Sequence, residues 1–209
     1  MTTKARSTKT TAKKSRSNGS PSKSRSTKSS GNKKQKTLEE LLEDNLKDIY
    51  SAEMQLIEAL PEMADAAYNS ELQRAFLKHL EQTKKQFQRL ENIFEQFDLD
   101  PDEVETCEAM QGLIDEGNKI IEEYEESHVR DSALIIAAQK IEHYEIAAYG
   151  SLCELSDVLG YSNIHDLLGR TLEEEESTDE ILTEIAVAIN DEAKEMSDEE
   201  MEHEDDNLS

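Results

Sequence analysis

Hydrophobic positions recur along most of this chain in alternating steps of three and four residues, from about residue 37 to residue 194. This spacing places apolar side chains on one face of an α-helix. No stretch shows the strict alternation of apolar and polar residues that is typical of a half-buried strand. Five helical stretches follow one another, so the pattern predicts an all-α fold.

Start and stop signals separate the five predicted helices. They are, in chain order, the capping-box pair Thr37 and Glu40, the start at Asn69-Ser70, the start at Asp100-Pro101, the cap Asp131 of a helix that Gly160 ends, and the start near Ser162. Pro61 lies inside the first stretch, where we expect it to kink the helix or break it locally. Gly112 and Gly117 interrupt the third stretch, which is shorter than the others.

The lengths of these stretches predict how the helices are arranged. Four of them span about 25 residues or more, which corresponds to roughly 37 Å each. The shorter third stretch lies where a ferritin-like bundle needs a long crossover between its second and third main helices. The sequence therefore predicts a ferritin-like antiparallel four-helix bundle with an extra crossover helix.

Charge divides the chain into unequal parts. The net charge is -25, yet residues 1–36 hold 12 of the 23 Lys and Arg and no acid, so the remainder carries 11 bases against 48 acids. The basic segment has too few apolar residues to offset the entropy of ordering it. We therefore expect a disordered basic tail over 1–36, a bundle domain over 37–194 and an acidic C-terminal tail over 195–209.

Composition also narrows the partners and the compartment. The two cysteines are too few for a disulfide framework, which favours a reducing cytoplasm. No apolar run is long enough for a membrane span or resembles a signal peptide, and the basic tail lacks the amphipathic face of a transit peptide. The acidic body should repel nucleic acid and membranes, whereas the tail can attract acidic partners.

Acidic residues occupy apolar positions in three of the helical patterns. In the first helix the series Leu42, Leu46, Ile49, Leu56, Leu60 is interrupted by Glu53. Glu175 and Asp179 lie in the middle of the fifth pattern. Glu145 lies within the fourth, with Glu142 beside it one turn earlier.

Several carboxylates near one level of a bundle would repel one another unless a cation lies among them. Dinuclear carboxylate centres are built in this way, and oxygen-rich ligands suit iron or manganese. The alternative for any single position is a partly exposed boundary residue, and part of the Glu173–Glu176 run is expected to be a solvated face. Acids on three separate helices favour the metal hypothesis.

The second helix offers fewer ligands. His79 is its best metal-ligand candidate, with Gln82 and Gln86 nearby, although a lone histidine on an apolar face is often a hydrogen-bonded core residue. No Glu-x-x-His motif occurs. The predicted metal ligands are Glu53, His79, Glu142, Glu145, Glu175 and Asp179.

Several stretches of the chain resemble the YciE/YciF family of ferritin-like bacterial stress proteins over roughly residues 38–190. The matching stretches are LKDIYSAEMQLIEALPEMA at 46–64, HLEQT at 79–83, RLENIF at 89–94, CEAMQGLIDEG at 107–117, RDSALIIAAQKIEHYEIAAYGSL at 130–152 and TLEEEESTDEILTEIA at 171–186. The resemblance implies a ferritin-like fold, stress-linked expression, a homodimer and a dinuclear iron site. The chain departs from the family on the second helix, where Gln82, Lys84 and Gln86 replace Glu or His of some relatives.

Two functions remain open from the sequence. One is a dinuclear iron or manganese protein that acts in oxidative-stress defence. The other is a non-enzymatic helical dimer whose basic tail, residues 1–36, binds nucleic acid without sequence specificity or binds another acidic partner. A third interpretation treats the seam acids as relics in a bundle that only associates.

Overall fold

The computed structural model describes residues 35–206 of the chain, with side chains described from residue 35 to residue 196. Every regular element within this range is a helix, which confirms the all-α prediction. The elements are α1 (Leu38–Ala66), α2 (Ser70–Phe97), the 3-10 turn η1 (Pro101–Glu103), α3 (Glu108–Glu123), α4 (His128–Leu159) and α5 (Ser162–Asp206). None of the described helices is long and apolar enough to cross a membrane.

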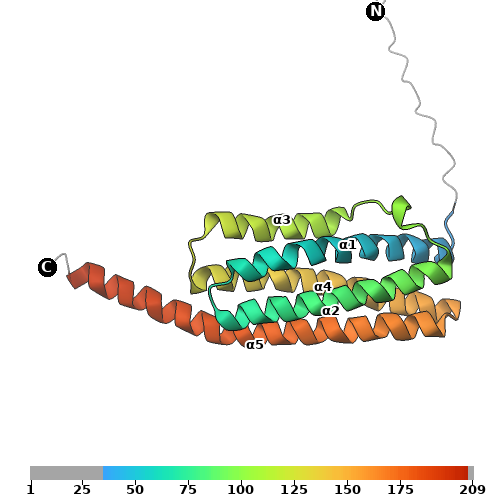
Figure 1. Ribbon diagram of the computed structural model, residues 1–209. Helices are drawn as coiled ribbons and strands as arrows, with labels where there is room; N and C mark the ends of the chain where they lie inside the picture. The colour runs from blue at the N-terminus through green and yellow to red at the C-terminus, as the bar shows by residue number, and fades with distance from the viewer. Residues whose placement is uncertain (1–34, 207–209) are drawn as a thin grey trace, which may run out of the picture. The chain divides into compact units, whose positions relative to one another are not determined.

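The four long helices surround one apolar core, and the short helix α3 lies on its outside (Figure 1). α1 packs against α2 and α4, and α5 packs against α4 and α2, so that each long helix has two long neighbours. α3 packs against α1 and α4. It connects the end of α2 to the start of α4, as predicted for a crossover between two helices that point the same way.

Capping residues define three helix ends as the sequence predicts. Thr37 and Glu40 form the expected capping box, and Asn69 accepts hydrogen bonds from the first turn of α2. Gly160 ends α4 with a φ of 81°, a left-handed conformation that glycine adopts without steric cost. α1 continues through Pro61 to Ala66, so the chain does not break there.

The predicted start of α4 is wrong. Ser127, not Asp131, is the N-cap, and its hydroxyl accepts from the Arg130 N–H. The Asp131 carboxylate is fully buried and instead accepts the N–H groups of Tyr68 and Asn69, at 2.8 and 2.7 Å. Asp131 therefore joins the start of α4 to the α1–α2 connection.

The predicted start of α3 is also too early. The Asp100-Pro101 signal produces only the single turn η1, and α3 begins at Glu108. The preceding residue, Cys107, is buried, and its N–H donates to the Ser51 hydroxyl on α1 at 2.9 Å. This contact holds the connecting chain extended against α1 before the helix begins.

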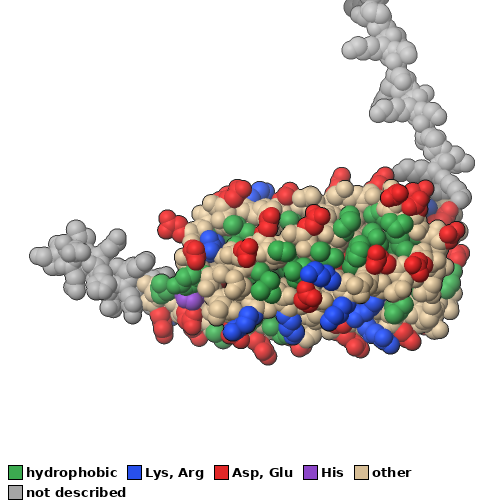
Figure 2. Space-filling view, in the orientation of Figure 1, with side chains coloured by type: hydrophobic (Ala, Val, Ile, Leu, Met, Phe, Trp, Pro, Cys, Tyr) green, Lys and Arg blue, Asp and Glu red, His purple; other side chains and the backbone are tan. Residues whose placement is uncertain are grey.

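The outer surface carries charge along its whole length. Figure 2 shows acidic side chains spread over this face of the bundle, with most of the Lys and Arg grouped along α2 and α5. α5 continues to Asp206, past the boundary at 194 that the sequence suggested. The division into a tail, a bundle and a second tail stays a prediction, and residues 1–34 lie outside the described part of the chain.

Candidate metal centre

Four glutamates meet in the interior of the bundle. Glu53 comes from α1, Glu142 and Glu145 from α4, and Glu175 from α5, and none of them is more than 2% exposed. Each replaces an apolar residue on the inward face of a helix, which is where the sequence pattern placed it. Because carboxylates are almost never buried without a partner, this gathering demands a physical explanation.

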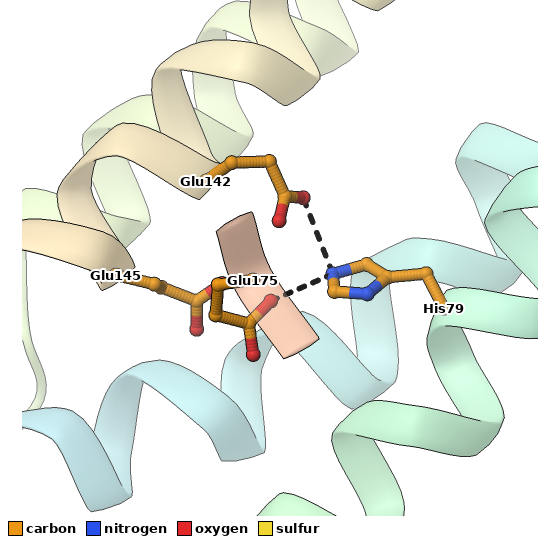
Figure 3. Close-up of side chains that lie close together, drawn as sticks. All are labelled: His79, Glu142, Glu145 and Glu175. Atoms are coloured by element: carbon orange, nitrogen blue, oxygen red, sulfur yellow. Dashed lines mark ion pairs between the residues drawn. The ribbon is translucent and has the colours of Figure 1, made fainter. Parts of the chain in front are cut away.

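His79 reaches these carboxylates from α2. Its Nε2 lies 3.2 Å from Glu142 Oε1 and 3.9 Å from Glu175 Oε2, as the dashed lines in Figure 3 show. Ligand atoms of His79, Glu142, Glu145 and Glu175 all lie within 4.8 Å of one another, and all four residues are buried. Four of the six predicted ligands therefore converge into one group, referred to below as the His79 cluster.

The other ring nitrogen of His79 has a polar neighbour. Its Nδ1 lies 3.5 Å from the Thr178 hydroxyl oxygen, and this hydroxyl donates to the Glu174 carbonyl at 3.0 Å. Because the Thr178 hydroxyl proton points at the Glu174 carbonyl, the Thr178 oxygen acts toward His79 as an acceptor, and His79 Nδ1–H is the donor. The network therefore assigns the histidine proton to Nδ1 and directs the Nε2 lone pair toward the carboxylates.

Unpaired atoms line the same space. Among the described residues, seven buried atoms of these five side chains lack a hydrogen-bond donor or acceptor: Glu53 Oε2, His79 Nε2, Glu142 Oε2, both carboxylate oxygens of Glu145 and both of Glu175. Buried polar atoms are normally satisfied, and an unpaired carboxylate is especially costly. Bound metal ions would give these atoms partners.

Burial changes how these groups titrate. It raises the pKa of Glu53, Glu142 and Glu145 well above the ordinary value, and the neighbouring carboxylates raise these pKa values further. Burial also raises the pKa of Glu175 and lowers the pKa of His79 to about 4. Without a cation, the low-dielectric interior therefore favours neutral carboxylic acids and a neutral imidazole.

Glu53 lies beside the His79 cluster and has its own hydrogen-bond donor. The Tyr149 hydroxyl, fully buried on α4, donates to Glu53 Oε1 and leaves Oε2 free. Two other tyrosines on α1 and α4 have different partners. Tyr50 stacks on Phe94 instead, and Tyr144 donates to Asp48.

Asp179 does not join the group. Its side chain is 22% exposed, accepts from Gln139 Nε2 at 3.2 Å and lies 3.3 Å from Nε2 of the exposed His143. The inward position on this turn of α5 belongs to Thr178, which is buried. Asp179 therefore lies at the rim of the site, outside the His79 cluster.

Sequence reasoning missed an ion pair that joins α2 to α5 next to the buried glutamates. Both guanidinium nitrogens of Arg89 donate to the Glu174 carboxylate at 2.7 Å, and buried Gln86 donates to the same carboxylate at 3.1 Å. Glu174 belongs to the acidic run that the sequence assigned in part to a solvated face, an assignment that holds for exposed Glu173 and Glu176. The sequence around Glu174 does not indicate that this glutamate faces an arginine on another helix.

The residues present fit a metal ion by the chemistry of their donors. Three carboxylates and one neutral imidazole provide the oxygen and nitrogen ligands that first-row transition metals accept. The buried His/Glu cluster in an all-helical fold defines the class: a helical-bundle protein with an interior group that can hold a metal ion.

The chain belongs to the DUF892 family, described as a domain of unknown function, whose model matches residues 37–195. It is 47% identical to protein YciF of Escherichia coli strain K12 over 152 residues, which cover 73% of this chain and 92% of that protein. The resemblance inferred from the sequence motifs is thereby confirmed.

Solved structures agree with this assignment. The fold matches the crystal structure of the E. coli stress protein YciF with a TM-score of 0.72 and 46% identity, over 75% of this chain and 99% of that one. It matches the protein YcfI from Rhodopseudomonas palustris with a TM-score of 0.67 and 38% identity, over 71% and 94% of the two chains. A protein from Xanthomonas campestris, 21% identical with a TM-score of 0.61 over 78% and 99%, shares the fold.

Proposed function

We propose that this protein binds two iron or manganese ions among its buried glutamates and acts in defence against oxidative stress. The observation that carries the proposal is the set of unpaired carboxylate oxygens around His79 Nε2. Oxygen-rich sites with one imidazole suit iron and manganese, and the dinuclear carboxylate proteins of helical bundles use such ligands. The description of the E. coli relative as a stress protein supports the biological role.

Charge supports two ions rather than one. Glu53, Glu142, Glu145 and Glu175 together carry four negative charges when ionised, which equals the charge of two divalent ions. The His79 cluster would hold the first ion. Glu53, whose pKa responds to the charge of Glu175, lies beside the cluster with Oε2 unpaired and would hold the second together with Glu145 and Glu175.

The chain's own residues prepare the site for such ions. Thr178 fixes the tautomer of His79, Tyr149 orients Glu53, and the Arg89–Glu174 pair joins α2 to α5. Buried apolar residues beside the site, such as Leu56 and Ile141, exclude bulk water. Bound iron or manganese would supply the redox chemistry with oxygen or peroxide.

Metal analysis tests the proposal directly. Protein purified without chelator and then loaded anaerobically with Fe(II) or Mn(II) should contain about two ions per chain, because a prepared ligand set binds without reorganisation. Glu145→Gln should lower this content, whereas Glu176→Gln, on an exposed position of α5, should not. Less than about one ion per two chains after loading would overturn the proposal.

A second candidate function rests on the basic segment. Residues 1–36 carry 12 positive charges and no acid, which supports salt-dependent binding of nucleic acid or another polyanion without sequence preference. The same proposal includes a homodimer, as the family resemblance implies. DNA binding should disappear when residues 1–36 are deleted and weaken steeply with salt, and binding that survives the deletion would contradict the candidate.

A further inference from the structure

A small pocket lies directly beside the His79 cluster. Its volume is about 20 Å³. All four long helices line it, mostly with apolar side chains: Leu56, Leu60, Met63, Phe76, Ala138, Ile141, Ile181 and Leu182. These apolar lining residues do not belong to the proposed ligand set.

The inner end of the pocket is the candidate metal centre itself. His79 and Glu142 belong to its lining, and His79 Nε2 and Glu142 Oε2 are two of the unpaired buried atoms. In Figure 3 these two side chains approach each other from opposite helices. A molecule in the pocket would therefore lie next to two of the proposed ligands.

The outer end of the pocket lies at the seam between α2 and α5. Lys78 is exposed, and Ala75, Gln82 and Ile181 are partly exposed, although all four belong to the lining. The remaining apolar lining residues are buried. The pocket therefore leads from a partly exposed mouth on the α2–α5 side to His79 and Glu142.

We propose that this pocket is the binding site and entry route for a small, uncharged, weakly polar molecule of the size of dioxygen. A volume of about 20 Å³ exceeds the ~10–15 Å³ that one water-sized molecule needs, but it excludes organic substrates. The apolar walls exclude ions because they offer no compensation for lost hydration. Hydrogen peroxide needs several hydrogen-bond partners, and the mostly apolar walls offer few of them: Lys78, His79, Gln82, Glu142 and Thr178 are the polar lining residues.

The entry-route role rests on the proposed metal site, because a molecule in the pocket can react only if an ion is bound at the inner end. The pocket itself can be tested without metal. Dry apolar cavities bind xenon, an uncharged atom close to dioxygen in size. Xenon therefore reports whether the pocket accepts such a molecule, independently of any reaction.

The experiment uses methyl NMR of the full-length, metal-free chain under xenon pressure. Xenon should shift the methyl signals of Leu56, Leu60 and Leu182. Ala75→Leu should reduce these shifts to less than about half, because its added carbons occupy a space of only about 20 Å³. The matched control Ala147→Leu, at an exposed site on α4, should leave them unchanged.

A second variant tests the same pocket in the opposite direction. Ile181→Ala removes carbons at the partly exposed mouth and should increase the xenon-induced shifts. Absent shifts in the unaltered protein, as for a pocket filled by ordered water, or equal shifts in Ala75→Leu would overturn the proposal. Metal analysis of the same samples separates the two failures: xenon binding with no metal uptake refutes the metal site and the entry-route role, while metal uptake without xenon binding refutes the pocket alone.

Discussion

The hydroxyl of Tyr149 donates a hydrogen bond to Glu53 Oε1 across the interface between α4 and α1. Both side chains are fully buried, and the bond leaves Glu53 with one free oxygen for a ligand. Tyr149 thus orients a proposed metal ligand without belonging to the ligand set. Partners of this kind tune metal affinity in many proteins.

Replacing Tyr149 with Phe should weaken metal binding more than it weakens the fold. Loss of the donor frees Glu53 to rotate, so affinity for Mn(II) should fall by about tenfold, while unfolding free energy changes by less than about 1.5 kcal/mol. Calorimetric titration measures the first quantity and urea unfolding the second. Tyr50→Phe, whose ring stacks on Phe94, is the matched control and should leave affinity intact. Equal Mn(II) affinities in the unaltered protein and both variants would show that Tyr149 does not influence metal binding.

Replacing His79 with Ala should abolish tight binding at the first ion position. The imidazole is the only nitrogen ligand in the His79 cluster, and its loss should lower affinity by about tenfold or more. Metal content after gel filtration provides the measurement. His143→Ala removes an imidazole from the exposed side of α4 and should retain full metal content. If His143→Ala loses as much metal as His79→Ala, the position of His79 Nε2 beside the carboxylates does not explain metal binding.

The metal-free protein should lose stability as pH rises. Burial raises the pKa of Glu145 above its ordinary value of 4.5 and the pKa of Glu175 to about 8, so the folded state holds protons that the unfolded chain has released. Their stabilising contribution is complete below the unfolded value and disappears as pH passes the folded values. His79 has the opposite effect on stability, because its pKa is lowered from 6.5 to about 4. This effect is confined to pH values below 6.5.

Thermal unfolding with chelator present tests this dependence. Between about pH 6.5 and pH 8, where His79 is neutral in both states, the Tm should fall by about 5 °C or more. Glu145→Gln removes one titrating group and should flatten the slope. Saturating metal should reverse the trend, since ions hold the ligands ionised and compete with protons. A metal-free Tm that stays constant over this range would show that the carboxylates are already ionised in the fold.

Asp131 should be among the most sensitive positions outside the site. Asp131→Ala leaves the N–H groups of Tyr68 and Asn69 without their acceptors, at a cost of about 2–4 kcal/mol. Urea unfolding measures this loss. Asp115→Ala, on the exposed surface of α3, should change stability by less than about 0.5 kcal/mol. Similar losses for both variants would contradict a special role for Asp131.

The sequence predicted well what depends on helical periodicity. Glu53, Glu145 and Glu175 were recognised because each interrupts an apolar series, and Glu142 because it flanks one. All four are buried. Asp179 shows the limit of this reasoning. The next inward position after Glu175 is three or four residues later, at Thr178 or Asp179. With 3.6 residues per turn, periodicity does not decide between them. The packing of the helices places Thr178 inward.

Contacts between distant segments could not be predicted. The start of α3 depends on the hydrogen bond from Cys107 to Ser51, and the role of Asp131 depends on Tyr68 and Asn69. The Arg89–Glu174 pair joins residues 85 positions apart in the chain. None of these contacts follows a local pattern, because each forms only after the helices have packed.

The four buried carboxylates come from three helices, so the unfolded chain cannot assemble them. With the proposed ions bound, mass action would favour the folded chain, whereas an ion-starved chain would lose this stabilisation and keep four buried carboxyl groups without the partners that the ions supply. Such a chain would open more often and be degraded faster. The amount of this protein in a cell would then follow the supply of its ion, which makes its turnover a sensor of metal availability.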